Sequence, residues 1–308
     1  MNIGIIGAGA MGCLYASMLS NKQNVSLFDV SETTKNAINQ NGIVCSVPDE
    51  DAKTFQVPAF LSGEGTAPLD LVIIFVKDMA SEAALNGNRA LIGENTILLS
   101  LQNGMGNREV MEKFVPAERI LLGTTKHNCV AKAPGIIYHS GAGATHIGSP
   151  AGNRAVAEAV AAAFNECGVE TEVCDGVNHL IWEKLFVNMT INPITAILDC
   201  EIGIIAEDGY ARAAADALIR EAVAVAAADG EKFDADEVFD ALMATARRLS
   251  TGRASMCQDI ENRRRTEIDF INGAVVRLGK KYGIATPAHE MIVQLVHAKE
   301  NAVRKTAE

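Results

Sequence analysis

The chain lacks three features, each of which would point to a particular class of protein. Its seven cysteines are scattered and include no C-x-x-C pair, so neither a zinc site nor a disulfide framework is expected. Basic side chains are outnumbered, with 27 Lys and Arg against 38 Asp and Glu and a formal net charge of −11. Nucleic-acid and membrane surfaces need the opposite balance, so we expect neither as a partner.

Long apolar runs are the third absence. The most apolar stretches, at residues 69–76 and 213–228, are interrupted by charged side chains, so neither can span a membrane. No basic signal-peptide start precedes the first apolar stretch. Scattered thiols fit a reducing compartment, so we predict a soluble cytoplasmic protein. Its 308 residues are enough for two domains.

The first half of the chain alternates short apolar stretches with helical ones. Strands are expected at 3–6, 25–28, 71–76, 96–101 and 120–125, and helices at 11–19, 31–39, 80–91 and 108–114. The stretch at 71–76 is the most continuously apolar, which is typical of a parallel sheet covered on both faces. We therefore predict a Rossmann-type, doubly wound α/β sheet.

The pattern changes after residue 125. Short runs at 136–138 and 145–147 predict antiparallel hairpins appended to the sheet, followed by a helix at 154–167 and an edge strand at 170–173. Only helices are expected beyond that, at 178–199, 211–229, 234–250, 256–282 and 287–302, the first of them bent at Pro193. We predict a dinucleotide-binding domain at 1–174 and an all-helical substrate and catalytic domain at 175–308.

A glycine motif follows the first predicted strand and opens the first predicted helix. It reads Gly7-Ala8-Gly9-Ala10-Met11-Gly12. The first glycine permits a tight turn, the second lets the backbone approach a pyrophosphate, and the third lets helix pack on strand. The whole motif would then bind a nicotinamide dinucleotide at the helix N-terminus. The alternative is a tight strand–helix turn and nothing more.

Asp29 ends the second predicted strand, where a carboxylate can accept hydrogen bonds from the adenosine ribose hydroxyls and repel a 2′-phosphate. It favours NAD over NADP. The alternative role is a cap for the next helix, which Ser31 can perform equally well. Lys77, just past a strand, keeps NADP open because its ammonium could hold a phosphate, although it could equally be a surface lysine.

Lys184, Asn188 and Asn192 stand at positions i, i+4 and i+8, so they share one side of a helix. Reduction of a ketone needs a proton on the oxygen as hydride reaches the carbon, and a partly buried lysine can supply it. The two amides can donate to a carboxylate or hydroxyl of the substrate. The alternative is that Lys184 pairs with Glu183 or Glu207 at the surface while the asparagines cap the bend.

Three further residues are candidates for the same site. Asn103 follows a strand, where an amide can touch nicotinamide or substrate, although Asn-Gly is also an ordinary turn. Ser255 and Gln258 form a capping box at a long helix, whose N-terminus could also bind a carboxylate. Glu267, farther along that helix, could bind a substrate hydroxyl or orient Lys184. Its alternative is a salt bridge to Arg263 or Arg264. The run 263–265 itself is expected to be a solvated helix face.

These motifs resemble the ketopantoate reductases (2-dehydropantoate 2-reductases) in order along nearly the whole chain. The matching segments are 7–12, 102–104, 182–188, 192–196, 255–259 and 266–273. The resemblance implies a Rossmann domain, a helical domain and a site in the cleft between them. It implies Lys184 as general acid and Glu267 as the residue that positions substrate and lysine. It implies that Asn103, Asn188, Asn192 and Ser255 line the substrate pocket.

Two positions depart from the pattern of the family. Its pantothenate-pathway members carry a basic residue just after the second strand, where this chain has Asp29-Val30. They also carry an asparagine where this chain has Ile202. Relatives with an apolar pocket and an NAD-like ribose site include the D-2-hydroxyacid (D-mandelate) dehydrogenases.

The first interpretation is therefore an NAD(P)-dependent reductase of a 2-oxo acid, ketopantoate. A D-2-hydroxyacid dehydrogenase is the alternative. A dinucleotide sensor would not need Lys184 and Glu267 together, and a β-hydroxyacid dehydrogenase would not explain Ser255 and Glu267. The last helices could supply a homodimer interface. No metal is expected.

Overall fold

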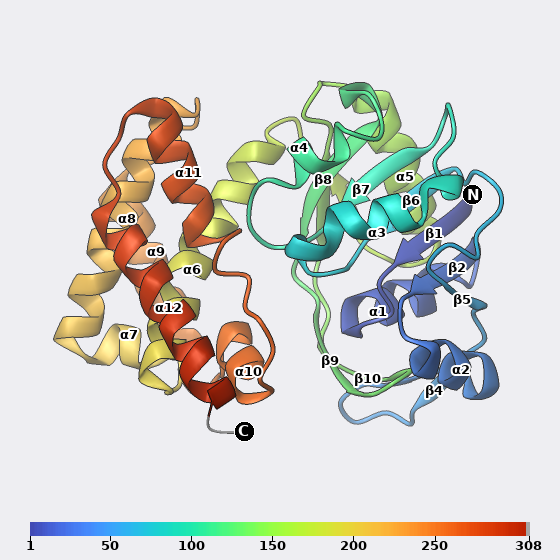
Figure 1. The fold of residues 1–308 in the computed structure, drawn as a ribbon, viewed down its shortest axis with the longest axis horizontal. Coiled ribbons are helices and arrows are strands. Elements are labelled where there is room, and N and C mark those ends of the chain that lie inside the picture. The colour runs from blue at the N-terminus through green and yellow to red at the C-terminus, as the bar shows by residue number, and fades with distance from the viewer. Residues whose placement is uncertain (306–308) are drawn as a thin grey trace. The chain divides into compact units, whose positions relative to one another are not determined.

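The computed structural model describes residues 1–305, which form two compact units (Figure 1). Unit 1 consists of Met1–Gln102 and Asn107–Val177. Unit 2 consists of the short segment Asn103–Gly106 and the chain from Asn178 onward. Among residues 1–305, no helix combines the length and the apolar character that a membrane crossing needs.

Unit 1 is built on an eight-stranded sheet in the order β12-β11-β8-β7-β6-β1-β2-β5. Neighbouring strands from β8 to β5 are parallel, and β11 is antiparallel to β8. The bounds are β1 Asn2–Ile6, β2 Asn24–Asp29, β5 Ala59–Leu61, β6 Leu71–Ile74, β7 Ile97–Ser100, β8 Ile120–Thr125, β11 Thr145–Gly148 and β12 Thr171–Val173. The predicted doubly wound α/β sheet is confirmed, including the edge position of β12.

The helices of unit 1 alternate with these strands. They are α1 Ala10–Leu19, α2 Glu32–Asn41, α3 Ser81–Gly87, α4 Asn107–Met111 and α5 Arg154–Glu166, with three 3₁₀ turns at Asp78–Ala80, Arg89–Leu91 and Ala117–Arg119. β1 and β6 are almost entirely buried, because strands covered by helices on both faces need apolar side chains on both.

A second, four-stranded sheet in unit 1 was not predicted. Its order is β4-β3-β10-β9, with bounds Lys53–Phe55, Ile43–Ser46, Ile136–Gly141 and Asn128–Ala133. The predicted hairpin at 136–138 therefore belongs to this sheet and is not appended to the main one. β9 is exposed along nearly its whole length, so its sequence has no alternation of apolar and polar residues that would indicate a strand. The sheet packs on α1 through β3, β9 and β10.

Unit 2 is helical from α6 to α12 (Figure 1). The bounds are α6 Val177–Leu198, α7 Ile204–Glu207, α8 Gly209–Ala228, α9 Ala235–Arg248, α10 Ser255–Glu261, α11 Asn272–Tyr282 and α12 Pro287–Lys305. The predicted all-helical second part is confirmed. Its core includes the fully buried Trp182 and Met189 of α6 together with apolar faces of α8, α9, α11 and α12.

One predicted helix, at 256–282, is wrong because the chain forms two helices there. α10 ends at Glu261 and α11 begins at Asn272, with Arg263 in the left-handed region at φ 55°. The break is stabilised from α12, since Glu300 accepts hydrogen bonds from the backbone N–H and the hydroxyl of Thr266, both at 2.7 Å. Such tertiary contacts override local helix propensity.

Candidate active site

The glycine turn lies at the carboxyl end of β1, where the strand order of the main sheet reverses between β6 and β2. Open α/β sheets bind ligands at such a switch point. Gly7 has φ 104°, and a Cβ added there would come within 2.8 Å of the carbonyl carbon of Phe75. A Cβ on Gly12 would lie 1.8 Å from the Gly7 oxygen. The backbone packing therefore requires both glycines.

Gly9 differs from them, because a Cβ there would meet nothing within 4 Å. It is exposed and forms the N-cap of α1, which has neither a side-chain cap nor an acidic residue in its first turn. Ala8 before it is buried, and Ala10 and Met11 after it are half-buried. This end of α1 therefore combines open space with the positive end of the helix dipole, as a pyrophosphate requires.

Asp29 ends β2 and joins the glycine turn to the next helix. Its Oδ2 accepts a hydrogen bond from the Ala8 N–H at 2.7 Å, and its Oδ1 accepts one from the Ser31 N–H at 2.9 Å. Ser31, and not Asp29, caps α2, because its hydroxyl accepts from the Thr34 N–H at 3.2 Å. The half-buried carboxylate of Asp29 is thus fixed against the turn.

Lys77 lies just past β6, on the other side of β1 from Asp29, and is half-buried at the start of a 3₁₀ turn.

Gln102 supports the chain just past β6, a role that the sequence analysis did not predict. The Gln102 amide donates to the Val76 carbonyl at 2.6 Å and contacts the Ser81 hydroxyl at 2.8 Å. The position of Gln102 just past β7 was the available signal.

Asn103 belongs to unit 2, although the strand before it belongs to unit 1. The turn it opens has Gly104 at φ 84°, and a Cβ there would lie 2.4 Å from the Phe270 oxygen. The same oxygen accepts a hydrogen bond from the Met105 N–H at 2.9 Å. The Asn-Gly turn is therefore an anchored feature of the helical unit, adjacent to the segment that carries Glu267.

Lys184, Asn188 and Asn192 all lie on α6, so the predicted helical row is present. Lys184 and Asn188 are half-buried, and Asn192 is only 6% exposed. Within residues 1–305, the side-chain amides of both asparagines make no hydrogen bond to the protein, so they do not cap the helix at Pro193. Amides in this state are suited to a polar ligand.

The orientation of this row is set by the buried side of α6. Trp182, fully buried, donates from its indole nitrogen to Asp229 at 3.2 Å. The hydroxyl of Tyr282 on α11 donates to the same carboxylate at 2.7 Å. Asp229, at the end of α8, therefore ties α6 to α11 close to Lys184 along the chain.

The predicted capping box at Ser255 is wrong. Ala254 is the N-cap of α10, and no side chain caps this helix. Ser255 is the first helical residue and is exposed, while the Gln258 amide turns back to the Arg253 carbonyl at 3.1 Å. The Ser255 hydroxyl consequently has no capping role that would explain its presence.

The helical position predicted for Glu267 is also wrong. Glu267 is half-buried in the segment between α10 and α11, and its carbonyl accepts hydrogen bonds from the N–H groups of Phe270 and Ile271 at 3.0 Å. The arginine run 263–265 is exposed as predicted, but it lies in this segment and not on a helix. Within it, Arg264 pairs with Asp259 at 3.2 Å.

Two residues of α12 hold the Glu267 segment on both sides. Glu300 binds Thr266 directly before it, and the imidazole of His297 contacts Asp269 just after it at 3.0 Å. His297 and Glu300 are themselves 3.1 Å apart. Burial alone lowers the pKa of His297, but hydrogen bonds to Glu300 and Asp269 outweigh it and raise that pKa above 6.5.

The same contacts act on the other partner. Burial alone raises the pKa of Glu300, but hydrogen bonds from the backbone and hydroxyl of Thr266 and from His297 outweigh it and lower that pKa. Both shifts favour the charged forms of His297 and Glu300 over their neutral forms.

The predicted site residues thus fall into two groups. Unit 1 holds those predicted for the cofactor, apart from Asn103: the segment 7–12, Asp29 and Lys77. Unit 2 holds all those predicted for substrate and catalysis: Asn103, Lys184, Asn188, Asn192, Ser255 and Glu267.

Comparison with known proteins places most of the chain in one family. Residues 3–152 match the family described as "Ketopantoate reductase PanE/ApbA", and residues 176–300 match its C-terminal part. The chain belongs to the ketopantoate reductase family. Among members of this family, a 2-dehydropantoate 2-reductase of Streptococcus pyogenes serotype M3 is 37% identical over 305 residues, covering 97% of this chain and 98% of that one. The Pyrococcus horikoshii protein of the same name is 35% identical over 303 residues, covering 98% of both.

Solved structures agree with this family assignment. A D-mandelate dehydrogenase in ternary complex with NADH and anilino(oxo)acetate has a TM-score of 0.93 and 33% identity, covering 99% of this chain and 100% of that one. A 2-dehydropantoate 2-reductase from Geobacter metallireducens has a TM-score of 0.89 and 29% identity, covering 97% and 99%.

Two other features bear on the site of this ketopantoate reductase family member. Ile202 is 7% exposed in the core of unit 2 and lies against Gly252. Among residues 1–305, no group of three or more His, Cys, Asp or Glu side chains could hold a metal ion.

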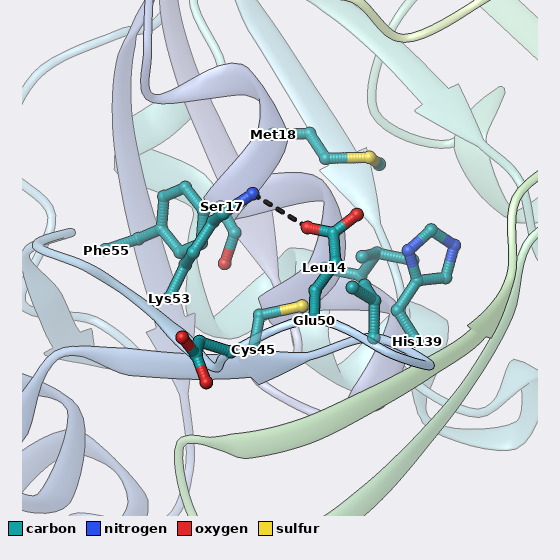
Figure 2. A pocket seen from close by; sticks show the side chains of 10 residues that line it. Leu14, Ser17, Met18, Cys45, Glu50, Lys53, Phe55 and His139 are labelled. Atoms are coloured by element: carbon teal, nitrogen blue, oxygen red, sulfur yellow. Dashed lines mark hydrogen bonds and ion pairs between the residues drawn. The ribbon is translucent and has the colours of Figure 1, made fainter.

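A cavity of about 280 Å³ in unit 1 contains none of the predicted site residues (Figure 2). It lies where α1 faces the four-stranded sheet, and Lys53 pairs with Glu50 at 3.0 Å beside it. The lining residues are Leu14, Ser17, Met18, Cys45, Val47, Glu50, Asp51, Lys53, Phe55 and His139. This cavity is therefore not the candidate active site.

Proposed function

We propose that the chain reduces 2-dehydropantoate (ketopantoate) to pantoate, with a nicotinamide dinucleotide as hydride donor. It is an NAD(P)-dependent oxidoreductase acting on a CH–OH group, as are the relatives named 2-dehydropantoate 2-reductase that match nearly its whole length. The observation that carries the proposal is the row of Lys184, Asn188 and Asn192 on one half-buried helix face. A protein that only sensed a dinucleotide would not need a proton donor there.

The proposed division of labour follows the two groups of residues. Residues 1–174 would bind the dinucleotide and 175–308 the oxo acid. The glycine turn fits the pyrophosphate because Gly9 leaves open space at an uncapped helix N-terminus. When bound, the dinucleotide supplies a hydride to the carbonyl carbon of the substrate.

Lys184 is the proposed general acid. As the carbonyl oxygen gains negative charge, the ammonium of Lys184 stabilises that charge and then transfers a proton to it. Asn188 and Asn192 donate hydrogen bonds to substrate oxygens without adding charge. Ser255 and Asn103 would contact the substrate, and Asn103 would also help to hold the nicotinamide. Glu267 accepts a hydrogen bond from the substrate hydroxyl and orients Lys184.

NAD is the proposed cofactor in preference to NADP. The carboxylate of Asp29 is fixed against the glycine turn at the end of β2, where it would accept from the ribose hydroxyls and repel a 2′-phosphate. Lys77 lies on the other side of β1, so it is less suited to neutralise that phosphate.

A D-2-hydroxyacid dehydrogenase is the second candidate. It is favoured by the structural similarity to D-mandelate dehydrogenase and by the apolar Ile202.

A cytoplasmic location is supported by seven free cysteines. Association into homodimers through the last helices is a further proposal, tested by the mass of the protein in solution.

Initial rates test the function directly. Ketopantoate, benzoylformate and 2-oxoisovalerate would each be supplied with NADH and with NADPH. The proposal predicts the highest kcat/KM for ketopantoate with NADH. Faster turnover of the aromatic acid would favour the dehydrogenase, and dinucleotide binding without turnover of any oxo acid would favour a sensor.

A further inference from the structure

Pro193 creates a defect in the helix that carries the proposed catalytic row. A proline has no N–H, so the carbonyl of Met189, one turn earlier, loses the donor that a helix normally provides. Met189 is fully buried, so water cannot replace that donor. The helix nevertheless continues through Pro193 to Leu198.

Asn272, the first residue of α11, supplies the missing donor. Its side-chain nitrogen donates to the Met189 carbonyl at 2.8 Å, and its side chain is fully buried. The same nitrogen lies 3.2 Å from Nδ1 of His289, whose Nε2 lies 2.9 Å from the Leu218 carbonyl.

This network has a single consistent arrangement of protons. A carbonyl only accepts, so Nε2 of His289 must carry the proton and donate to Leu218. Nδ1 is then an acceptor, and both hydrogens of the Asn272 amide are used, one by His289 and one by Met189. A flipped amide would place oxygen against both acceptors, so its orientation is fixed.

The hydrogen bond from Asn272 to Met189 lies next to residues of the proposed substrate site. Met189 directly follows Asn188, and Pro193 directly follows Asn192, so the repaired turn is the one that separates the two asparagines. Asn272 directly follows the segment that carries Glu267, and the next residue, Gly273, donates to the Ile268 carbonyl of that segment at 2.9 Å.

We propose that Asn272 is a positioning residue for the reaction: its bond to Met189 sets the turn between Asn188 and Asn192 and couples it to the Glu267 segment. This inference rests on the proposed function. Asn272 touches neither substrate nor cofactor in it and acts only through the backbone of α6.

A double-mutant cycle between Asn272 and Pro193 tests the contact. Asn272→Ala leaves the Met189 carbonyl without a donor, so kcat/KM for the oxo acid should fall by roughly 10-fold to 100-fold, as small misplacements of reacting groups do. Dinucleotide affinity should stay within about twofold, because the glycine turn belongs to unit 1. Pro193→Ala restores a backbone N–H, so in that background the Asn272→Ala loss should shrink at least about threefold.

Asn165→Ala is the matched control. It removes an amide that also donates to a backbone carbonyl, that of Thr171 at 2.8 Å, but in unit 1 and apart from every predicted site residue, so it should lower the melting temperature with little change in kcat. A purely structural role of Asn272 predicts the same behaviour for Asn272→Ala.

Each outcome decides one question. An equal Asn272→Ala loss in both backgrounds, or no loss of kcat/KM, overturns the positioning role. If Asn272→Ala does not fold, the Pro193→Ala background provides the donor, and an inactive folded double variant still contradicts the inference. If the wild type reduces no 2-oxo acid, the proposed function fails instead. The melting temperatures of the same variants then still test the hydrogen bond between Asn272 and the Met189 carbonyl.

Discussion

At the scale of single residues, the carboxylate of Asp29 is held by contacts that lie outside its own strand. The end of a strand is enough to single out Asp29, but its two backbone hydrogen bonds to Ala8 and Ser31 depend on how three segments meet. The same limit applies to Ser255, since the capping pattern is present and the cap is not.

Asp29→Asn should shift cofactor preference toward NADPH. The amide keeps one oxygen for the turn but loses the charge that repels a 2′-phosphate, so the ratio of kcat/KM for NADPH to that for NADH should rise roughly 10-fold, about 1.4 kcal/mol. Asp70→Asn is the control, because Asp70 also accepts a backbone N–H, from Asn2 at 2.7 Å, but lies outside the glycine turn. An unchanged ratio would show that Asp29 only supports the turn.

Ser255→Ala should separate function from stability. No cap is lost, so the free energy of unfolding should change by less than about 0.5 kcal/mol. KM for the oxo acid should rise because a hydroxyl that contacts substrate is removed. Ser31→Ala, which deletes a real cap of α2, should cost about 1 kcal/mol in urea unfolding without that rise. Equal stability losses in the two variants would contradict this account of Ser255.

At the scale of elements, long helices were predicted well and their interruptions were not. The sequence predicts α6 at 178–199, and it runs from Val177 to Leu198. The break between α10 and α11 depends on Glu300 and His297. These residues lie in a different helix and far along the chain, so no local window reveals them. The sequence analysis did not predict α7, because a helix this short shows no helical pattern in the sequence.

His297→Gln should lower the free energy of unfolding most at mildly acidic pH. The folded protein raises the pKa of His297 above its unfolded value, so the stabilisation is present below about 6.5 and is lost as the pH rises through the folded value. The loss in free energy of unfolding should therefore be larger at pH 6 than at pH 9. His146→Gln is the control, because its partner Glu172 in unit 1 is exposed and such a pair should add little stability at either pH. A larger loss at pH 9 would reverse the assignment of the ion pair.

At the scale of the whole molecule, the alternation of strands and helices was enough to predict the doubly wound sheet and the helical second part. Two features were beyond it. The four-stranded sheet includes the exposed β9, which has no apolar signature. The segment Asn103–Gly106 leaves unit 1 for unit 2, which depends on the bond from Met105 to Phe270. That bond places Asn103 in the same unit as Glu267.

The central claim is that Lys184 protonates an oxo acid while a separate unit holds the dinucleotide. The most direct measurement is kcat/KM for ketopantoate, together with the dissociation constant for NADH, in Lys184→Ala and in the exposed-lysine control Lys22→Ala. Loss of a general acid predicts a fall of roughly 10²–10⁴-fold in kcat/KM for Lys184→Ala only, with NADH binding unchanged within about twofold. Full turnover by Lys184→Ala would contradict the account.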